Sequence, residues 1–268
     1  MARPLRIEYP GAFYHISARG NDKNEIFTTD YDKDKFLFYI KNAYLRFSFI
    51  IHAYCLMPNH YHLLMETPYA NLSRCMQYIN SSYTTYYNKA QKRVGHLFQG
   101  RYKAIVVDKD AYLNELSRYI HLNAVAAGLS NTPYEYPWCS YHYYVGSKIL
   151  PNYMETKTIM ASFESKKSYR QFVAAGMLKE KFPLQKLTLK GCILGDEAFA
   201  MKIKNKYVDT NKKVRDLPDL RKLKQSVKPS QLILKLITEE NSISDKEKKK
   251  ITSKLSPQLC WGLSFEVI

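Results

Sequence analysis

Short strand-like runs alternate with longer helical runs over the first half of the chain, and this order constrains the fold more than any other feature. Residues 12–18 are aromatic and β-branched with partial alternation, which predicts a strand, and residues 19–22 supply turn formers. Apolar positions then recur at helical spacing over residues 31–47, after the capping residues Thr29 and Asp30. We therefore predict a first strand followed by a first helix.

The alternation continues to Gly128, where a glycine is expected to end a helix. Residues 48–56 and 60–66 are strand-like runs separated by the breaker Met57-Pro58-Asn59, which predicts two antiparallel strands joined by a tight turn. The order β-α-β-β-α-β-α predicts an antiparallel sheet with helices packed on it, an α+β fold. The other elements expected are a helix over 71–92, a strand over 103–107 and a helix starting at Asp108 or Asp110.

The second half of the chain has a weaker pattern and a basic character. Residues 134–144 are densely aromatic and are expected to close the first domain, and a second region starts near Ser165. Between residues 202 and 250, fifteen Lys or Arg stand against seven Asp or Glu. We predict a domain over 1–150 and a basic, mainly helical C-terminal extension over 151–268, which either is a solvated surface or contacts DNA.

The charge balance points to a polyanionic partner. The chain has 41 Lys and Arg against 24 Asp and Glu, a formal net charge of +17, and such a field attracts nucleic acid. The 23 tyrosines can stack on unpaired bases, although most are expected to be core or surface residues. A generally basic, well-solvated protein is the alternative.

Several classes of protein are disfavoured. The five cysteines are odd in number and include no C-x-x-C pair, which disfavours a disulfide framework and a thiolate zinc site. No apolar run approaches the roughly 20 residues that span a bilayer, and the N-terminus lacks the apolar stretch of a signal peptide. We expect a cytoplasmic protein with no membrane partner.

His60 and His62 are two residues apart on a predicted strand, so their side chains project from the same face. Both imidazoles can therefore reach one divalent ion. A pair of hydrogen-bonded or surface histidines is the alternative for this pattern. Tyr119 and Asn123 are four residues apart on a predicted helix, so a phenol and an amide share one helix face. Packing of the tyrosine and capping by the asparagine are the alternatives.

Four separate segments resemble one family in the correct order. Residues 53–64 resemble the histidine-hydrophobic-histidine motif of the IS200-like, single-tyrosine (HUH) transposases, and 119–123 with 127–129 resemble their tyrosine helix. The resemblance covers roughly residues 5–145, and in detail it is strongest to the REP-associated tyrosine transposases. The two further matching segments are FYHISARGN at 13–21 and FQGRY at 98–102.

The resemblance implies a ferredoxin-like antiparallel sheet flanked by helices. It makes His60 and His62 metal ligands for Mg or Mn, Tyr119 the nucleophile, and Asn123 a third ligand at a place where relatives more commonly carry Gln. It also implies an enzyme that nicks and rejoins single-stranded DNA near hairpins through a 5′-phosphotyrosine, as a monomer or a homodimer. The chain departs from the family at Ala124 and Ala126, where many relatives carry Pro and a basic residue.

Basic residues near these segments are candidate DNA contacts, with plain solvated charges as the alternative. His15 and His121 are expected to be buried, hydrogen-bonded structural histidines, with a place near the site as the alternative. Two other functions fit the composition: a non-catalytic regulator that binds hairpin DNA on the same fold, and a metal-dependent phosphodiesterase that uses water. The candidate DNA contacts are Arg3, Arg6, Arg19, Lys23, Arg101 and Lys103.

Overall fold

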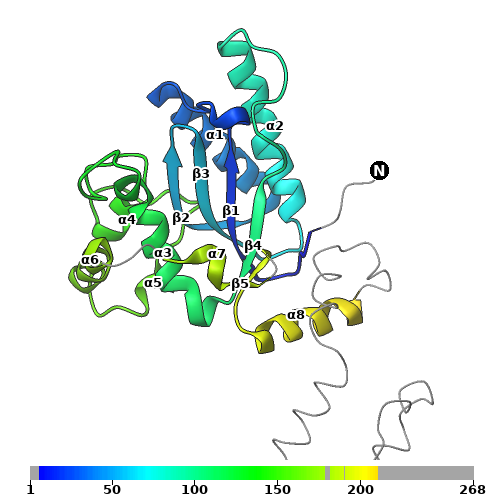
Figure 1. The fold of residues 1–268 in the computed structure, drawn as a ribbon, viewed down its shortest axis with the longest axis vertical. Helices are drawn as coiled ribbons and strands as arrows, with labels where there is room; N and C mark the ends of the chain where they lie inside the picture. Colours follow the sequence, from blue (N-terminus) through cyan, green and yellow to red (C-terminus); the bar gives the residue numbers. More distant parts are fainter. Residues whose placement is uncertain (1–5, 179–181, 190, 211–268) are drawn as a thin grey trace, which may run out of the picture. The chain divides into compact units, whose positions relative to one another are not determined.

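The structure is a computed structural model, and it describes residues 6–178, 182–189 and 191–210. Its strands form one six-stranded sheet in the order β2-β3-β1-β4-β6-β5, and Figure 1 shows the first four side by side. The order β-α-β-β-α-β-α, the α+β class and the ferredoxin-like antiparallel sheet are confirmed. The strands are β1 (Ala12–Arg19), β2 (Ile50–Met57), β3 (His60–Thr67), β4 (Lys103–Val107), β5 (Thr188–Leu189) and β6 (Ile193–Leu194).

The helices follow the local signals in the sequence. At the start of α1, Thr29 and Asp32 form a capping box, and Asp108 caps α3 by accepting from the backbone N–H of Asp110. Ala124 is fully buried, and α3 continues through it to its last residue, Ala126. The helices are α1 (Asp30–Phe47), α2 (Leu72–Ala90), α3 (Lys109–Ala126), α4 (Tyr141–Val145), α5 (Lys157–Met160), α6 (Lys166–Ala175), α7 (Leu184–Leu187) and α8 (Glu197–Thr210), with 3-10 turns η1 (Asn21–Lys23) and η2 (Gly176–Leu178).

The two faces of the sheet are covered by different helices. On one face, Tyr61 of β3 packs against Phe36 of α1, which in turn contacts Tyr83 of α2. On the other face, α3 buries Leu116 and Ile120 in a cluster with side chains from all four long strands. Since alternate residues of a strand point to opposite faces, each strand has one face toward α1 and α2 and one toward α3.

The chain after α3 packs back onto this second face. The backbone N–H of Leu56 donates to Trp138 O (3.0 Å), so the aromatic segment 134–144 lies along β2. Tyr169 of α6 contacts Ser117 of α3 (Oη to Oγ, 3.1 Å), and β6 extends the sheet parallel to β4. The predicted boundary at residue 150 stays a prediction.

Some sequence expectations fall partly outside the described residues. The basic segment 202–250 is described only as far as residue 210, where it is helical as the end of α8. Cys260 also lies outside, whereas the cysteines in the described part are buried and form no disulfide: Cys55, Cys75, Cys139 and Cys192. Among the described helices, none is long and apolar enough to cross a membrane.

Candidate active site

Strands β1 and β3 place three histidines on the face of the sheet that α3 covers. The register pairs Arg19 with His60 and Ser17 with His62, and the period of two puts His15 on the same face as Ser17. Nε2 of His15 lies 2.9 Å from Nδ1 of His62, and the two rings stack at 5.1 Å between centroids. The His60 and His62 rings are also 5.1 Å apart and nearly perpendicular, at 87°.

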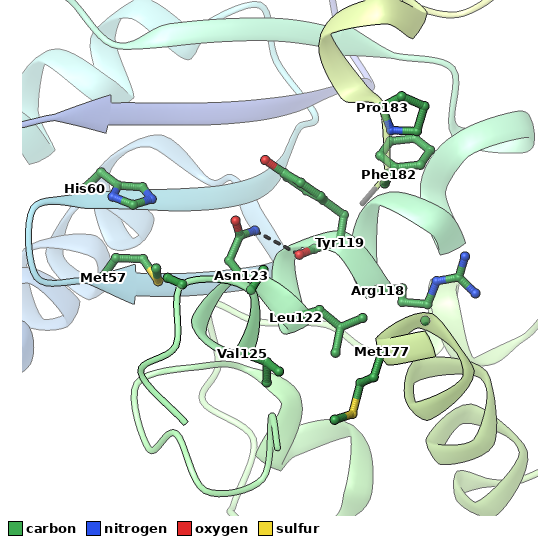
Figure 2. Close-up of a pocket in the computed structure, with 13 residues that line it drawn as sticks. Met57, His60, Arg118, Tyr119, Leu122, Asn123, Val125, Met177, Phe182 and Pro183 are labelled. Atoms are coloured by element: carbon green, nitrogen blue, oxygen red, sulfur yellow. Dashed lines mark hydrogen bonds between the residues drawn. The ribbon is translucent and has the colours of Figure 1, made fainter. Parts of the chain in front are cut away.

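Helix α3 supplies the phenol and the amide. The Tyr119 ring stands edge-on to His62, with 5.8 Å between centroids, and to His15, with 6.0 Å. Asn123 Nδ2 donates to the backbone oxygen of Tyr119 (2.9 Å), and Figure 2 shows Asn123, Tyr119 and His60 bordering one open space. The structure therefore brings together the four residues that the sequence singled out, and their chemical roles stay predictions.

The three histidines are neutral at neutral pH. Burial lowers the pKa of His62 well below its usual value, and the neighbouring histidines lower it further. Burial, followed by the charge of Lys103, lowers the pKa of His15 to about 3, and burial followed by Arg19 lowers that of His60. Each ring therefore keeps one nitrogen lone pair, as a metal ligand requires.

The donor set fits a divalent ion. His60 Nδ1 donates to Asn59 Oδ1 at 2.6 Å, and His62 Nδ1 is engaged by His15, which leaves the Nε2 atom of each ring without a partner among the described residues. Ligating histidines usually hold their second ring nitrogen in this way. The described residues contain no group of three or more His, Cys, Asp or Glu arranged to hold a metal. Two imidazoles and the Asn123 amide would therefore need water or phosphate oxygens to complete the shell.

Tyr119 is not an activated phenol on its own. Burial raises its pKa above the ordinary value of 10.0, and a hydrogen bond with Asn123 offsets this only in part. A phenol that stays protonated at neutral pH is a weak nucleophile, so attack by Tyr119 needs an electrophile beside it.

Two hollows meet at Tyr119. The first, which we call the basic cleft, has a volume of about 920 Å³ and is bordered by Arg19, Arg101, Lys103 and Lys186. The second, which we call the apolar pocket, has a volume of about 650 Å³. Its apolar walls come mainly from Met57, Leu122, Val125 and Met177 (Figure 2). Four residues border both hollows: His60, Tyr119, Phe182 and Pro183.

The candidate DNA contacts separate into groups. Arg19, Arg101 and Lys103 border the basic cleft. Lys23 is exposed on η1, outside the lining of that cleft. Arg6 instead stacks its guanidinium on Tyr102, 4.4 Å from the ring centroid, and donates to the backbone oxygen of Tyr102. Arg3 lies outside the described residues.

Sequence reasoning missed part of the site. His15 is buried and hydrogen-bonded, as expected, and it also contacts both His62 and Tyr119 at the site. The alternation of β1 places it on one face with Arg19, but only the pairing with β3 shows that the face is that of His62. His121 matches its expectation, because it is fully buried with Nε2 near Ser140 and Nδ1 near Tyr169, each at 2.8 Å. Phe182 and Lys186 come from a segment with no motif.

Comparison with known proteins identifies relatives of the first half. Residues 9–123 match the family model for IS200-like transposases. A Haemophilus influenzae protein named as a REP-associated tyrosine transposase is 25% identical over 152 residues, which cover 53% of this chain and 86% of that protein. A solved REP-associated tyrosine transposase bound to a REP hairpin is 19% identical, covers 56% of this chain and 89% of its own, and has a TM-score of 0.47. A transposase crystal structure from Deinococcus radiodurans is 16% identical, with 44% and 95% covered and a TM-score of 0.32.

Proposed function

The chain belongs to the IS200-like transposases through residues 9–123, and from this premise we propose that it nicks and rejoins single-stranded DNA beside a hairpin, with Tyr119 as nucleophile. One observation carries the proposal: the Tyr119 ring lies 5.8 Å from the His62 ring and borders, with His60, the hollow that holds the basic side chains. The Haemophilus influenzae relative is named as REP-associated, and this name supports a REP element as the substrate.

In this proposal, basic side chains bind the DNA and Tyr119 carries out the covalent step. Arg19, Arg101 and Lys103 bind the sugar-phosphate backbone in the basic cleft and hold the scissile phosphate beside Tyr119. The Tyr119 oxygen attacks phosphorus in line, forms a 5′-phosphotyrosine and releases a 3′ hydroxyl. Because the ester bond energy is conserved in this link, a later 3′ hydroxyl can rejoin the strand without ATP.

His60 and His62 would hold a divalent ion, Mg or Mn, through their Nε2 atoms, with Asn123 as a third ligand. When bound, such an ion polarises the scissile phosphate and stabilises charge on its non-bridging oxygens. The hydrogen bonds from His60 to Asn59 and between His62 and His15 keep both rings in orientation for this task.

The test is an adduct assay with the full chain. We expect a covalent protein–DNA adduct on a denaturing gel after incubation with hairpin-bearing oligonucleotides and Mn or Mg. Tyr119→Phe should bind the same DNA without forming the adduct. Tyr86→Phe is a matched control, because its hydroxyl donates to Asp32 (2.9 Å) of α1 on the other side of the sheet.

Each other outcome assigns a different function. Tight binding without cleavage, over many hairpin sequences, would assign the chain as a non-catalytic regulator. Cleavage without an adduct would assign a phosphodiesterase that uses water. Full activity of Tyr119→Phe would move the nucleophile to another tyrosine.

A further inference from the structure

A DNA strand that places its scissile phosphate at Tyr119 must continue in both directions. Tyr119 and His60 border the basic cleft and also the apolar pocket, so the two hollows adjoin at the site. The strand can therefore leave Tyr119 through one hollow on each side. What each hollow holds depends on the chemistry of its walls.

The apolar pocket lacks free cations for a phosphate backbone. Arg118 is the one Lys or Arg among its lining residues in the described part of the chain. Its guanidinium is already paired with Glu115 and stacked on Phe172 at 4.4 Å. Glu115 thus offsets the charge of Arg118, whereas Lys103 and Lys186 of the basic cleft are exposed to solvent.

The walls of the apolar pocket suit a flat, uncharged group. Met57, Leu122, Val125 and Met177 offer apolar surface, and Phe182 stands at the junction with its ring 6.0 Å from that of Tyr119. Aromatic and apolar faces bind unstacked bases without regard to sequence. Asn123 and His60 add polar groups at the end nearest the site.

The pocket is built by close packing of η2 on α3. A Cβ added at Gly176 would lie 2.7 Å from Cδ of Arg118 and 2.8 Å from Cδ1 of Leu122, so any larger residue there would have to push these side chains aside. The neighbouring Met177 then lines the pocket, whereas Leu178 is 93% exposed and does not.

We propose that the apolar pocket binds the unstacked base of the nucleotide next to the scissile phosphate, on the side away from the hairpin. The hairpin, with its dense phosphates, lies on the side of the basic cleft. This inference rests on the proposed function, because it assumes that the scissile phosphate lies at Tyr119. It adds a second element of substrate recognition, an unpaired base held beside the cut.

The experiment measures the affinity of the full chain for hairpin oligonucleotides with an abasic site at each position around the cut in turn. It uses fluorescence anisotropy in the Tyr119→Phe background, so that no covalent product forms. We expect one position next to the cut at which removal of the base weakens binding about tenfold or more. Met177→Trp, which fills the pocket, should weaken binding of intact DNA similarly and make that abasic site neutral. Leu178→Trp, one residue away and exposed, should behave as the parent protein.

The outcomes separate this inference from the function on which it rests. Two outcomes would overturn the base-binding role of the apolar pocket alone, provided that the wild type still forms its adduct. The first is equal affinity for the abasic DNA at every flanking position. The second is a Met177→Trp protein that stays fully sensitive to the abasic site. An abasic-sensitive position that Met177→Trp abolishes, in a protein without adduct formation, would keep the pocket and overturn the tyrosine chemistry. No binding to any hairpin DNA would overturn both.

Discussion

His15 Nε2 lies 2.9 Å from His62 Nδ1, and this contact couples the tautomers of the two histidines. For His62 Nε2 to ligate a metal, its Nδ1 must carry the proton and donate to His15. His15 then carries its own proton on Nδ1, an atom that is buried without a hydrogen-bond partner among the described residues. The opposite tautomers would turn His62 Nε2 into a hydrogen-bond donor. We therefore expect His15 to act as a positioning residue for His62.

Loss of the His15 acceptor should weaken metal binding. We expect His15→Phe to lower the affinity for Mn by about 10- to 100-fold. Loss of the hydrogen bond to the ring nitrogen that does not bind the metal typically has an effect of this size. His15→Gln should restore most of the affinity, since a side-chain oxygen can accept from His62 Nδ1. A competition titration with Mn, without DNA, measures both. Equal affinities for wild type and His15→Phe would contradict the positioning role.

Replacement of His60 and His62, the proposed ligands, should abolish metal-dependent cleavage. We expect the double variant His60→Ala with His62→Ala to show no cleavage at any Mn concentration, while hairpin DNA still binds. Asn123→Ala should raise the Mn concentration needed for half-maximal cleavage, because water can replace one amide ligand. His96→Ala, on an exposed histidine, is the control. Cleavage by the double variant at wild-type rate would remove both histidines from the site.

The basic cleft should determine the salt dependence of DNA binding. We expect Arg101→Gln with Lys103→Gln to reduce the slope of log affinity against log salt by about two, roughly one for each lost phosphate contact. Lys41→Gln with Arg46→Gln removes the same charge from exposed positions on α1, on the far face of the sheet, and should leave the slope unchanged. Equal slopes for the two double variants would mean that net charge, not the cleft, drives binding.

A buried ion pair away from the site should give the fold a pH optimum. His52 is fully buried, with Nε2 2.9 Å from Glu66 Oε2 and Nδ1 3.3 Å from Glu155 Oε2. Burial opposes the charged imidazole, but the contacts with Glu155 and Glu66 outweigh it and raise the pKa of His52 above 6.5. The contact with His52 lowers the pKa of Glu155 from 4.5 to about 2, with help from Thr158.

The directions of these two pKa shifts define the pH range in which they stabilise the fold most. A raised His52 pKa stabilises the fold fully below 6.5, and this stabilisation is lost as pH rises through the folded pKa. A lowered Glu155 pKa stabilises it above 4.5, and this is lost as pH falls toward 2. We therefore expect the thermal midpoint to be highest between pH 4.5 and pH 6.5 and to decrease on either side of this range. His52→Gln should flatten the alkaline side and cost about 1–3 kcal/mol at pH 6. An unchanged alkaline limb in His52→Gln would assign the pH dependence to other groups.

Local patterns were sufficient to predict the elements that carry the site. The period of two placed His60 and His62 on one face of a strand, and the four-residue spacing placed Tyr119 and Asn123 on one face of a helix. Such predictions succeed because the face of a residue depends only on the backbone geometry of its own element. The two-residue strands β5 and β6 are too short for any periodicity, and they were not predicted.

By itself, the sequence determined the order and types of the elements from β1 to α3, and the internal faces of β3 and α3. Only the tertiary structure decided which faces meet. The pairing of β1 with β3 brought His15 to His62, and the packing of α3 on the sheet brought Tyr119 to both. Residues 176–177, 182–184 and 186 border the hollows beside Tyr119, where a basic cleft and an apolar pocket meet. These arrangements depend on contacts between residues far apart in the chain, which no local periodicity encodes.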